Sequence, residues 1–296
     1  MCIRDSFPFW SDDVPVSVAE VIDGRAVPYP SAEWNNRDQD ESFNAVQSVV
    51  IDSENRLWVL ETNNPRFEGV EKSGPVLFQF DLKTNQKERS FSFPAGVYRP
   101  NSYFNDVRVD AERDVAYVTD SGNGALIALD LKTGTARRLL DDHPSTRHEV
   151  GYLVCDGVKW ENRVDADGIA LTPDRAYLYY IALTSHTLYR IPTDALVDES
   201  LSAETLSGYV EQVATVPATD GMMFDESGNL WMGGLEDNSI NRLNAAGELA
   251  RVVQDSAIRW ADSFAIDGKG RVYFTTSQIH LPEERRGRYQ ILSLTP

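Results

Sequence analysis

The chain alternates short apolar runs with polar turns, and one arrangement of the two recurs five times. The copies are QSVVID, NDVRVD, DGIALTPD, DGMMFD and DSFAID. Each opens with an oxygen-bearing side chain, and these are Gln47, Asn105, Asp167, Asp220 and Asp262 in turn. A polar turn and a second run follow each copy: RLWVLET, VAYVTDS, AYLYYIA, NLWMGGL and RVYFTTS. Short alternating runs rich in aromatic and β-branched residues predict β-strands. Each unit is therefore predicted to be a small antiparallel sheet, with an oxygen-bearing side chain just before its first strand.

Repeats of roughly 40 to 60 residues with several short strands are typical of β-propellers. The predicted fold is all-β, a six-bladed β-propeller with its first blade truncated at the N-terminus. We expect residues 1–6 to be a non-native segment and residues 7–296 to be one domain. Its predicted parts are a partial blade at 7–36 and blades at about 44–94, 104–142, 167–216, 220–255 and 261–296. The stretch DALVDESLSAETL is predicted to hold the only short helix.

Two outer hairpins, FDLKTNQKER and LDLKTGTARR, are near-copies of one another. Asn85 and Gly134 stand at the turn positions that favour a positive φ. Cys155 is expected to be a small buried residue, and no spacing of the two cysteines and four histidines suggests zinc.

The net charge of the 296-residue chain is -18, and its sequence pI is about 4.6. Such a chain repels phosphate backbones and anionic membrane surfaces, so nucleic acid is a poor partner. No apolar run approaches the roughly 20 residues that a membrane-spanning helix needs, which argues against membrane insertion. A small molecule is the predicted partner, and the oligomeric state is open.

The repeated polar positions would lie on the innermost strands of the blades, around a central channel. If Asp167, Asp220 and Asp262 converge there with Asn105 and Gln47, mutual repulsion raises some carboxyl pKa values unless a cation joins them. Carboxylate and amide oxygens suit Ca²⁺, which tolerates irregular geometry. The alternative is a polar, water-filled channel without a metal.

Several linked motifs carry a family resemblance over nearly the whole chain. They are LETN…GPVLFQFDLKTN, FNDVRVD…AYVTDSGNGALIALDLKTG, RRLLDDHPS, DGIALTPD…LYYIALTSHTLYRIPT and WADSFAID…VYFTTSQIH. Together they resemble the major royal jelly and Yellow protein family in its bacterial branch. The resemblance implies a six-bladed, secreted or periplasmic propeller, with either dopachrome tautomerisation or the binding of small amines as its activity. Insect members usually carry paired cysteines that this chain lacks.

A second resemblance, to the senescence-marker and gluconolactonase propellers, concerns the site. TDGMMFDESGNLW is similar to the stretch that supplies their metal-binding aspartate, here Asp220, and FNDVRVD to their Asn-Asp pair, here Asn105 and Asp106. Asp167 matches a third ligand position, and Gln47 stands where they have a glutamate. The resemblance implies a calcium site made by Asn105, Asp167 and Asp220.

Two functions remain open at this point. In the enzyme hypothesis, Asp106 and Asp220 are catalytic and the substrate is a lactone or a dopachrome-like molecule. Gln47, Asn105, Asp262 and His280 would then bind that substrate. In the binding hypothesis, the same carboxylates hold a small amine or aromatic ligand without turnover.

Overall fold

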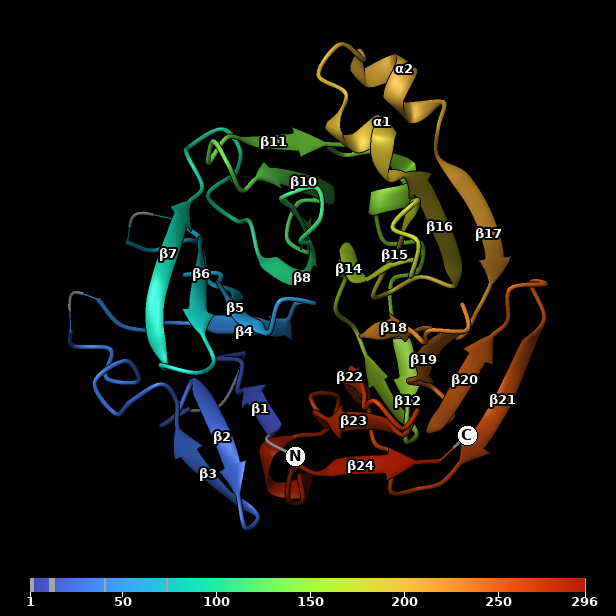
Figure 1. Ribbon diagram of the computed structural model, residues 1–296. Helices are drawn as coiled ribbons and strands as arrows, with labels where there is room; N and C mark the ends of the chain where they lie inside the picture. The colour runs from blue at the N-terminus through green and yellow to red at the C-terminus, as the bar shows by residue number, and fades with distance from the viewer. Residues whose placement is uncertain (1–2, 11–13, 40, 73, 296) are drawn as a thin grey trace. The chain divides into compact units, whose positions relative to one another are not determined.

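The computed structural model describes residues 3–10, 14–39, 41–72 and 74–295, and its regular structure is almost entirely β (Figure 1). Six antiparallel sheets of three or four strands follow one another along the described part of the chain, and in each the strands pair in chain order. They are the blades of a six-bladed β-propeller, as the repeats predict. The chain divides into two compact units, residues 1–138 and 139–296.

The first unit holds three of the sheets. The first comprises β1 (Ile3–Ser6), β2 (Val18–Ile22) and β3 (Arg25–Pro28). The second comprises β4 (Val46–Ile51), β5 (Arg56–Glu61), β6 (Val76–Asp81) and β7 (Gln86–Ser92), with the 3-10 turn η1 (Pro65–Phe67) between β5 and β6. The third comprises β8 (Phe104–Asp110), β9 (Val115–Asp120), β10 (Ala125–Asp130) and β11 (Ala136–Leu139), whose last residue opens the second unit.

The second unit begins with an insertion that holds η2 (Pro144–Thr146) and the hairpin of β12 (Leu153–Cys155) and β13 (Val158–Trp160). Its first sheet comprises β14 (Ala166–Leu171), β15 (Tyr177–Ala182), β16 (Thr187–Pro192) and β17 (Glu211–Thr215). The next comprises β18 (Met222–Phe224), β19 (Leu230–Gly234), β20 (Ser239–Leu243) and β21 (Leu249–Gln254). The last comprises β22 (Ala261–Ile266), β23 (Val272–Thr276) and β24 (Ile291–Leu294), with η3 (Glu283–Arg285) before β24.

Among the described residues two α-helices occur, α1 (Thr193–Val197) and α2 (Ala203–Ser207). The prediction of a single helix in this stretch is therefore wrong in number, because Ser202 caps a second helical turn through its hydroxyl. No helix in the described ranges is long and apolar enough to cross a membrane.

Within each unit, apolar cores lie between neighbouring sheets. Trp58, Phe91 and Phe104 belong to one such core in the first unit. Trp231, Ile240 and Phe274 belong to another in the second unit. Trp58 and Trp231, which stand at the same position of the second strand, thus pack between blades.

The outer-hairpin prediction is confirmed. Asn85 has φ 57° and Gly134 has φ 75°. The carboxylates of Asp81 and Asp130 each accept the backbone N–H groups two and three residues later. Asx turns of this kind fix both hairpins in the same way.

In two blades, the turn between the first and second strands is held by an aspartate that also bonds to a tryptophan. Asp225 Oδ1 accepts the backbone N–H groups of Ser227 and Asn229, and its Oδ2 accepts the indole N–H of the buried Trp231 at 2.9 Å. Asp52 makes the same set of contacts to its own turn and to Trp58 at 2.7 Å. One carboxylate therefore closes the turn and satisfies a buried indole.

We expect Asp225→Ala to lower the free energy of unfolding by about 2 kcal/mol, because it leaves the Trp231 indole N–H buried without an acceptor. Asp174→Ala is the matched control: Asp174 closes the equivalent turn through Thr172 and Ala176 alone. Urea denaturation followed by tryptophan fluorescence measures both variants. Equal losses in the two would contradict the role of the indole contact.

Candidate functional site

In four of the five copies the repeated polar residue stands at a break in strand register, whereas Asp220 lies just before β18, as predicted. The pairing of inner and second strands shifts between Val46 and Ser48, and between Phe104 and Val107. The same shift occurs between Ala166 and Ile169, and between Ala261 and Phe264. Gln47, Asn105, Asp167 and Asp262 thus lie inside their strands at β-bulges, rather than just before the strands as predicted. A bulge re-aims the side chain that it carries.

Threonines on two of the second strands support these bulges. Thr119 Oγ1 accepts the backbone N–H of Asp106, and Thr275 Oγ1 accepts that of Ser263, each at 3.1 Å. The bulge leaves these N–H groups without a ladder partner, and the hydroxyl supplies one. In the sequence these residues are the threonine of VAYVTDS and the first threonine of RVYFTTS. Their role can be recognised only once the strand pairing is known.

In the first unit the site residues form a neutral hydrogen-bonded chain. Tyr103 donates its hydroxyl to Gln47 Oε1 at 2.6 Å, and Gln47 Nε2 donates to Asn105 Oδ1 at 2.9 Å. Asn105 Nδ2 in turn donates to Ser121 Oγ at 2.9 Å. The two amides contact one another, and each uses its oxygen to accept a hydrogen bond. Asp106 is neutralised by Arg108, whose guanidinium lies 3.7 Å from its carboxylate.

Two buried carboxylates, those of Glu61 and Asp120, hold these hydrogen-bonded residues in place. Neither was predicted from the sequence. Glu61, 2% exposed, accepts the backbone N–H groups of Asn44 and Ala45 just before β4. Asp120 accepts that of Tyr103 just before β8 and is paired with Arg138 at 2.7 Å. Burial raises the pKa of Glu61, although the backbone donors oppose that shift.

In the second unit Asp167 and Asp262 lie on the inner strands β14 and β22, and Asp220 lies just before the inner strand β18. Gly221 donates its N–H to the carbonyl of Asp262 at 2.9 Å. A Cβ at Gly168 would lie 2.2 Å from the carbonyl oxygen of Asp220, and one at Gly221 would lie 2.1 Å from that of Asp262. The glycine after Asp167 and after Asp220 therefore lets neighbouring inner strands approach.

Asp220 and His280 are linked through a tryptophan. Trp260 is fully buried and donates its indole N–H to Asp220 Oδ2 at 2.6 Å. The His280 imidazole stacks on the Trp260 ring, with centroids 5.4 Å apart and planes 12° from parallel. Trp260, which opens the motif WADSFAID, thus connects two residues that were predicted for one site, and its own role was not predicted.

His280 is 3% exposed, and its two ring nitrogens differ. Nε2 lies 2.9 Å from Asp156 Oδ2, whereas Nδ1 is buried with no hydrogen-bond partner in the described part of the chain. The hydroxyl of Ser277, on the same loop, also has no such partner there. Burial lowers the pKa of His280, and the hydrogen bond and charge of Asp156 oppose part of that shift. The imidazole is therefore neutral at pH 7 and offers a lone pair on Nδ1.

His143 contrasts with His280. Both its ring nitrogens lie 2.8 Å from serine hydroxyls, those of Ser145 and Ser207. His143 therefore ties α2 to η2.

The predicted calcium ligands fit a metal poorly within either unit. Asn105 has its oxygen engaged by Gln47, and one oxygen of Asp220 is engaged by Trp260. Among the described residues no group of three or more His, Cys, Asp or Glu side chains could hold a metal ion. Calcium, and the ring of polar residues around a shared channel, stay predictions.

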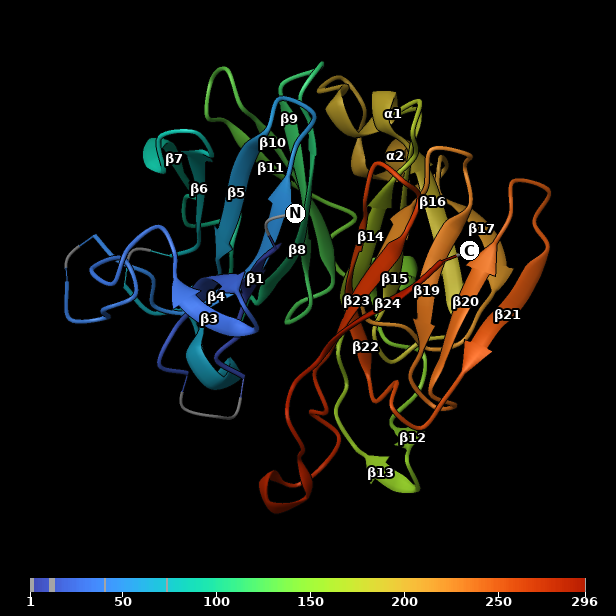
Figure 2. The ribbon, with the colours of Figure 1, turned by 60° about the horizontal axis from the view of Figure 1, so that its bottom comes forward.

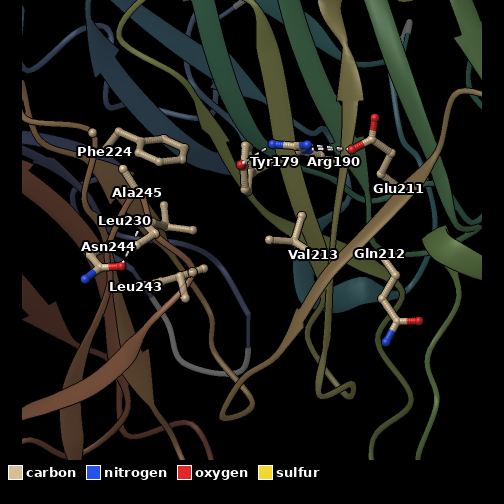
Figure 3. Close-up of a pocket in the computed structure, with 13 residues that line it drawn as sticks. Tyr179, Arg190, Glu211, Gln212, Val213, Phe224, Leu230, Leu243, Asn244 and Ala245 are labelled. Carbon is tan, nitrogen blue, oxygen red and sulfur yellow. Dashed lines mark hydrogen bonds and ion pairs between the residues drawn. The ribbon is translucent and has the colours of Figure 1, made fainter.

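A cavity of about 290 Å³ opens between the sheets β14–β17 and β18–β21 of the second unit (Figure 3). Tyr179 and Phe224 pack edge to face in its wall, with centroids 5.0 Å apart. Arg190 lies there between Tyr179 and Glu211, which accepts from it at 2.8 Å. The cavity is lined by Phe224, at the end of β18, and by the turn after Leu243. It therefore lies at the other end of β18 from Asp220, which precedes that strand. It holds none of the predicted site residues.

Comparison with known proteins agrees with the fold and the motifs. The family model described as major royal jelly protein matches residues 44–285. Protein yellow of Drosophila guanche is 24% identical over 256 residues, covering 76% of this chain and 44% of that protein. The chain thus spans less than half the length of this relative.

Two solved structures share the fold. One is a catalytically inactive histidine-to-alanine variant of virginiamycin B lyase from Staphylococcus aureus with quinupristin, with a TM-score of 0.53 and 14% identity, covering 87% of this chain and 69% of that one. The other is a gluconolactonase from Xanthomonas campestris, with a TM-score of 0.51 and 15% identity, covering 81% and 71%. Because the family model covers most of the sequence, the chain belongs to the major royal jelly protein family.

Proposed function

We propose that this protein is a proton-transfer enzyme of the tautomerase type, acting on small cyclic carbonyl or quinonoid molecules, with His280 as its base. The observation that carries the proposal is the buried, neutral imidazole, whose ring stacks on Trp260 and whose Nδ1 has no hydrogen-bond partner among the described residues. General bases work best when their pKa lies near the working pH.

The reaction needs no oxidant. His280 Nδ1 takes a proton from a carbon next to the carbonyl, and the C–H electron pair moves toward the carbonyl oxygen. A proton then returns to that oxygen, so the product is an isomer of the substrate. Asp220, held by the Trp260 indole, is the second group proposed to handle a proton. A histidine is also the residue replaced in the inactive variant of virginiamycin B lyase.

The proposal departs from the metal-assisted lactonase hypothesis. Hydrolysis of that kind needs a cation to polarise the carbonyl and activate water. The amide oxygens of Gln47 and Asn105 accept hydrogen bonds, and Asp106 is paired with Arg108. These contacts favour proton transfer by an imidazole over Lewis-acid chemistry.

A second candidate is a non-catalytic binder of small amines. It is favoured by the carboxylate of Asp220, which can serve as the counter-charge of an ammonium group. Secretion, which the family resemblance implies, belongs equally to either proposal.

The test is turnover of dopachrome and of gluconolactone by the purified protein, each with a chelator and with added calcium. We expect isomerisation of dopachrome at the same rate under both conditions, and no lactone hydrolysis. Lactone hydrolysis that appears only with calcium would contradict the proposal. Tight binding of an aromatic amine such as dopamine, with neither compound turned over, would favour the second candidate.

A further inference from the structure

The insertion between β11 and β14 contributes a residue to His280. Its hairpin, β12–β13, turns through Asp156 and Gly157, with Leu153 opposite Trp160 and Cys155 opposite Val158. Both turn residues have positive φ, 51° and 73°, as a two-residue type I′ turn requires. Figure 2 shows the hairpin at one end of the sheets of its unit, with α1 and α2 at the other end. The turn residue Asp156 lies 124 positions before His280 in the sequence and 2.9 Å from it in space.

Three further contacts hold the hairpin in place. Val154 donates its backbone N–H to Glu236 Oε1 at 3.1 Å, after β19. Asn238 Nδ2 donates to Asp156 Oδ1 at 2.6 Å. Trp160 packs edge to face on Trp260, with centroids 4.8 Å apart. The hairpin is thus fastened to the two last sheets of the unit, and both oxygens of Asp156 are engaged.

We propose that Asp156 is a positioning residue, which fixes the tautomer of His280 so that the proton sits on Nε2 and the lone pair on Nδ1. An ionised carboxylate only accepts hydrogen bonds, so the nitrogen that faces it must carry the proton. The role of Nδ1 as the base rests on the function proposed above. The tautomer itself does not depend on it.

Asp156 is suited to this role by its surroundings. Burial alone would raise its pKa, but hydrogen bonds from Asn238 and His280 lower it below its ordinary value. Arg259, 3.8 Å from the same carboxylate, also favours its charged form. The carboxylate is therefore ionised throughout the neutral range and remains an acceptor.

The contact with Asn238 makes Asp156→Asn a sharp test. Asn238 would continue to donate to the oxygen of the new amide at position 156. The NH₂ group of that new amide would then face His280. Nε2 would then have to accept, and the proton would move to Nδ1. In the double variant Asp156→Asn with Asn238→Leu, leucine cannot donate, so the amide is free to present its oxygen to His280 again.

The experiment is ¹⁵N NMR of histidine-labelled protein, with the His280 signals identified by their loss in His280→Gln. We expect Nε2 to be protonated and Nδ1 unprotonated in the wild type, the reverse in Asp156→Asn, and partial return to the wild-type pattern in the double variant. Glu236→Gln is the control, because Glu236 contacts the hairpin at Val154 but is not bonded to His280. Its tautomer should match the wild type.

An unchanged tautomer in folded Asp156→Asn would overturn the proposal, as would a wild type that already carries its proton on Nδ1. Thermal unfolding of each variant shows whether it is folded. If the tautomer reverses but dopachrome turnover does not fall, the positioning role stands and the function proposed for His280 fails. If both change together, with kcat lower by on the order of 10²-fold or more, both stand.

Discussion

Replacing His280 with glutamine should lower kcat for the isomerised substrate by about 10² to 10⁴-fold, the range that a positioned general base contributes. Glutamine can still donate to Asp156, so the contact with the hairpin is kept while the basic nitrogen is lost. Steady-state kinetics with the substrate found in the turnover assay measures the effect. We expect KM to change little, because the proposed contact is made chiefly with the transferred proton.

His143→Gln is the matched control for this variant. His143 is a histidine of the second unit that is only partly buried, and both its nitrogens bond to serine hydroxyls of the fold. Its replacement should cost stability and leave kcat unchanged. A loss of kcat in His143→Gln equal to that in His280→Gln would show that general disturbance of the unit, rather than the base, explains the loss.

The pH dependence of turnover follows from the same imidazole. Because burial lowers the pKa of His280 below its ordinary value of 6.5, the neutral base persists at and somewhat below that pH. Turnover should therefore fall only on further acidification, as Nδ1 takes up a proton. The folded state also binds this proton less readily than the unfolded state, so stability falls as pH decreases from 6.5 through the lowered pKa. Circular dichroism at each pH separates unfolding from protonation of the base.

Replacing Gly221 with alanine should cost about 3 kcal/mol of folding free energy, at the upper end of what overpacking usually costs. The new Cβ would lie 2.1 Å from the carbonyl oxygen of Asp262 and 3.3 Å from the Cα of Ser263. Both are backbone atoms of β22, so no side-chain rotation relieves the clash. The hydrogen bond from Gly221 N–H to Asp262 would break as the strands separate.

Gly268→Ala is the control for this prediction. A Cβ there meets nothing within 4 Å, and its backbone lies outside the left-handed region. It should change stability by no more than about 0.5 kcal/mol, as other surface substitutions do. Denaturant unfolding compares the two variants, and equal midpoints would contradict the close approach of the inner strands.

The fold could be predicted because its signals are local. Alternation along QSVVID and its copies, and the near-identical turns at Asn85 and Gly134, act within a few residues of one another. The bulges at Gln47 and Asn105 could not be predicted in this way, since they depend on the register of the neighbouring strand. The same limit explains why the polar positions were expected before the strands rather than inside them.

The candidate site was predictable only in part. The repeats led to Asp220, whereas its contact with Trp260, on which His280 stacks, could not be read from them. Asp156 was missed, although the Asp-Gly pair between LVC and VKW is a strong hairpin signal. Nothing in the sequence pairs it with His280, because the contact depends on how the insertion docks on sheets that come later in the chain. Glu61 was missed for a similar reason, since its role is to hold the backbone before β4.

The most direct test of the account is hydrogen exchange at the substrate carbon. The substrate is incubated with the protein in D₂O with a chelator present, and proton NMR follows the loss of the C–H signal. We predict that the wild type catalyses this exchange whether or not the chelator is present. His280→Gln should not catalyse it. Exchange that requires calcium, or that persists in His280→Gln, would contradict it.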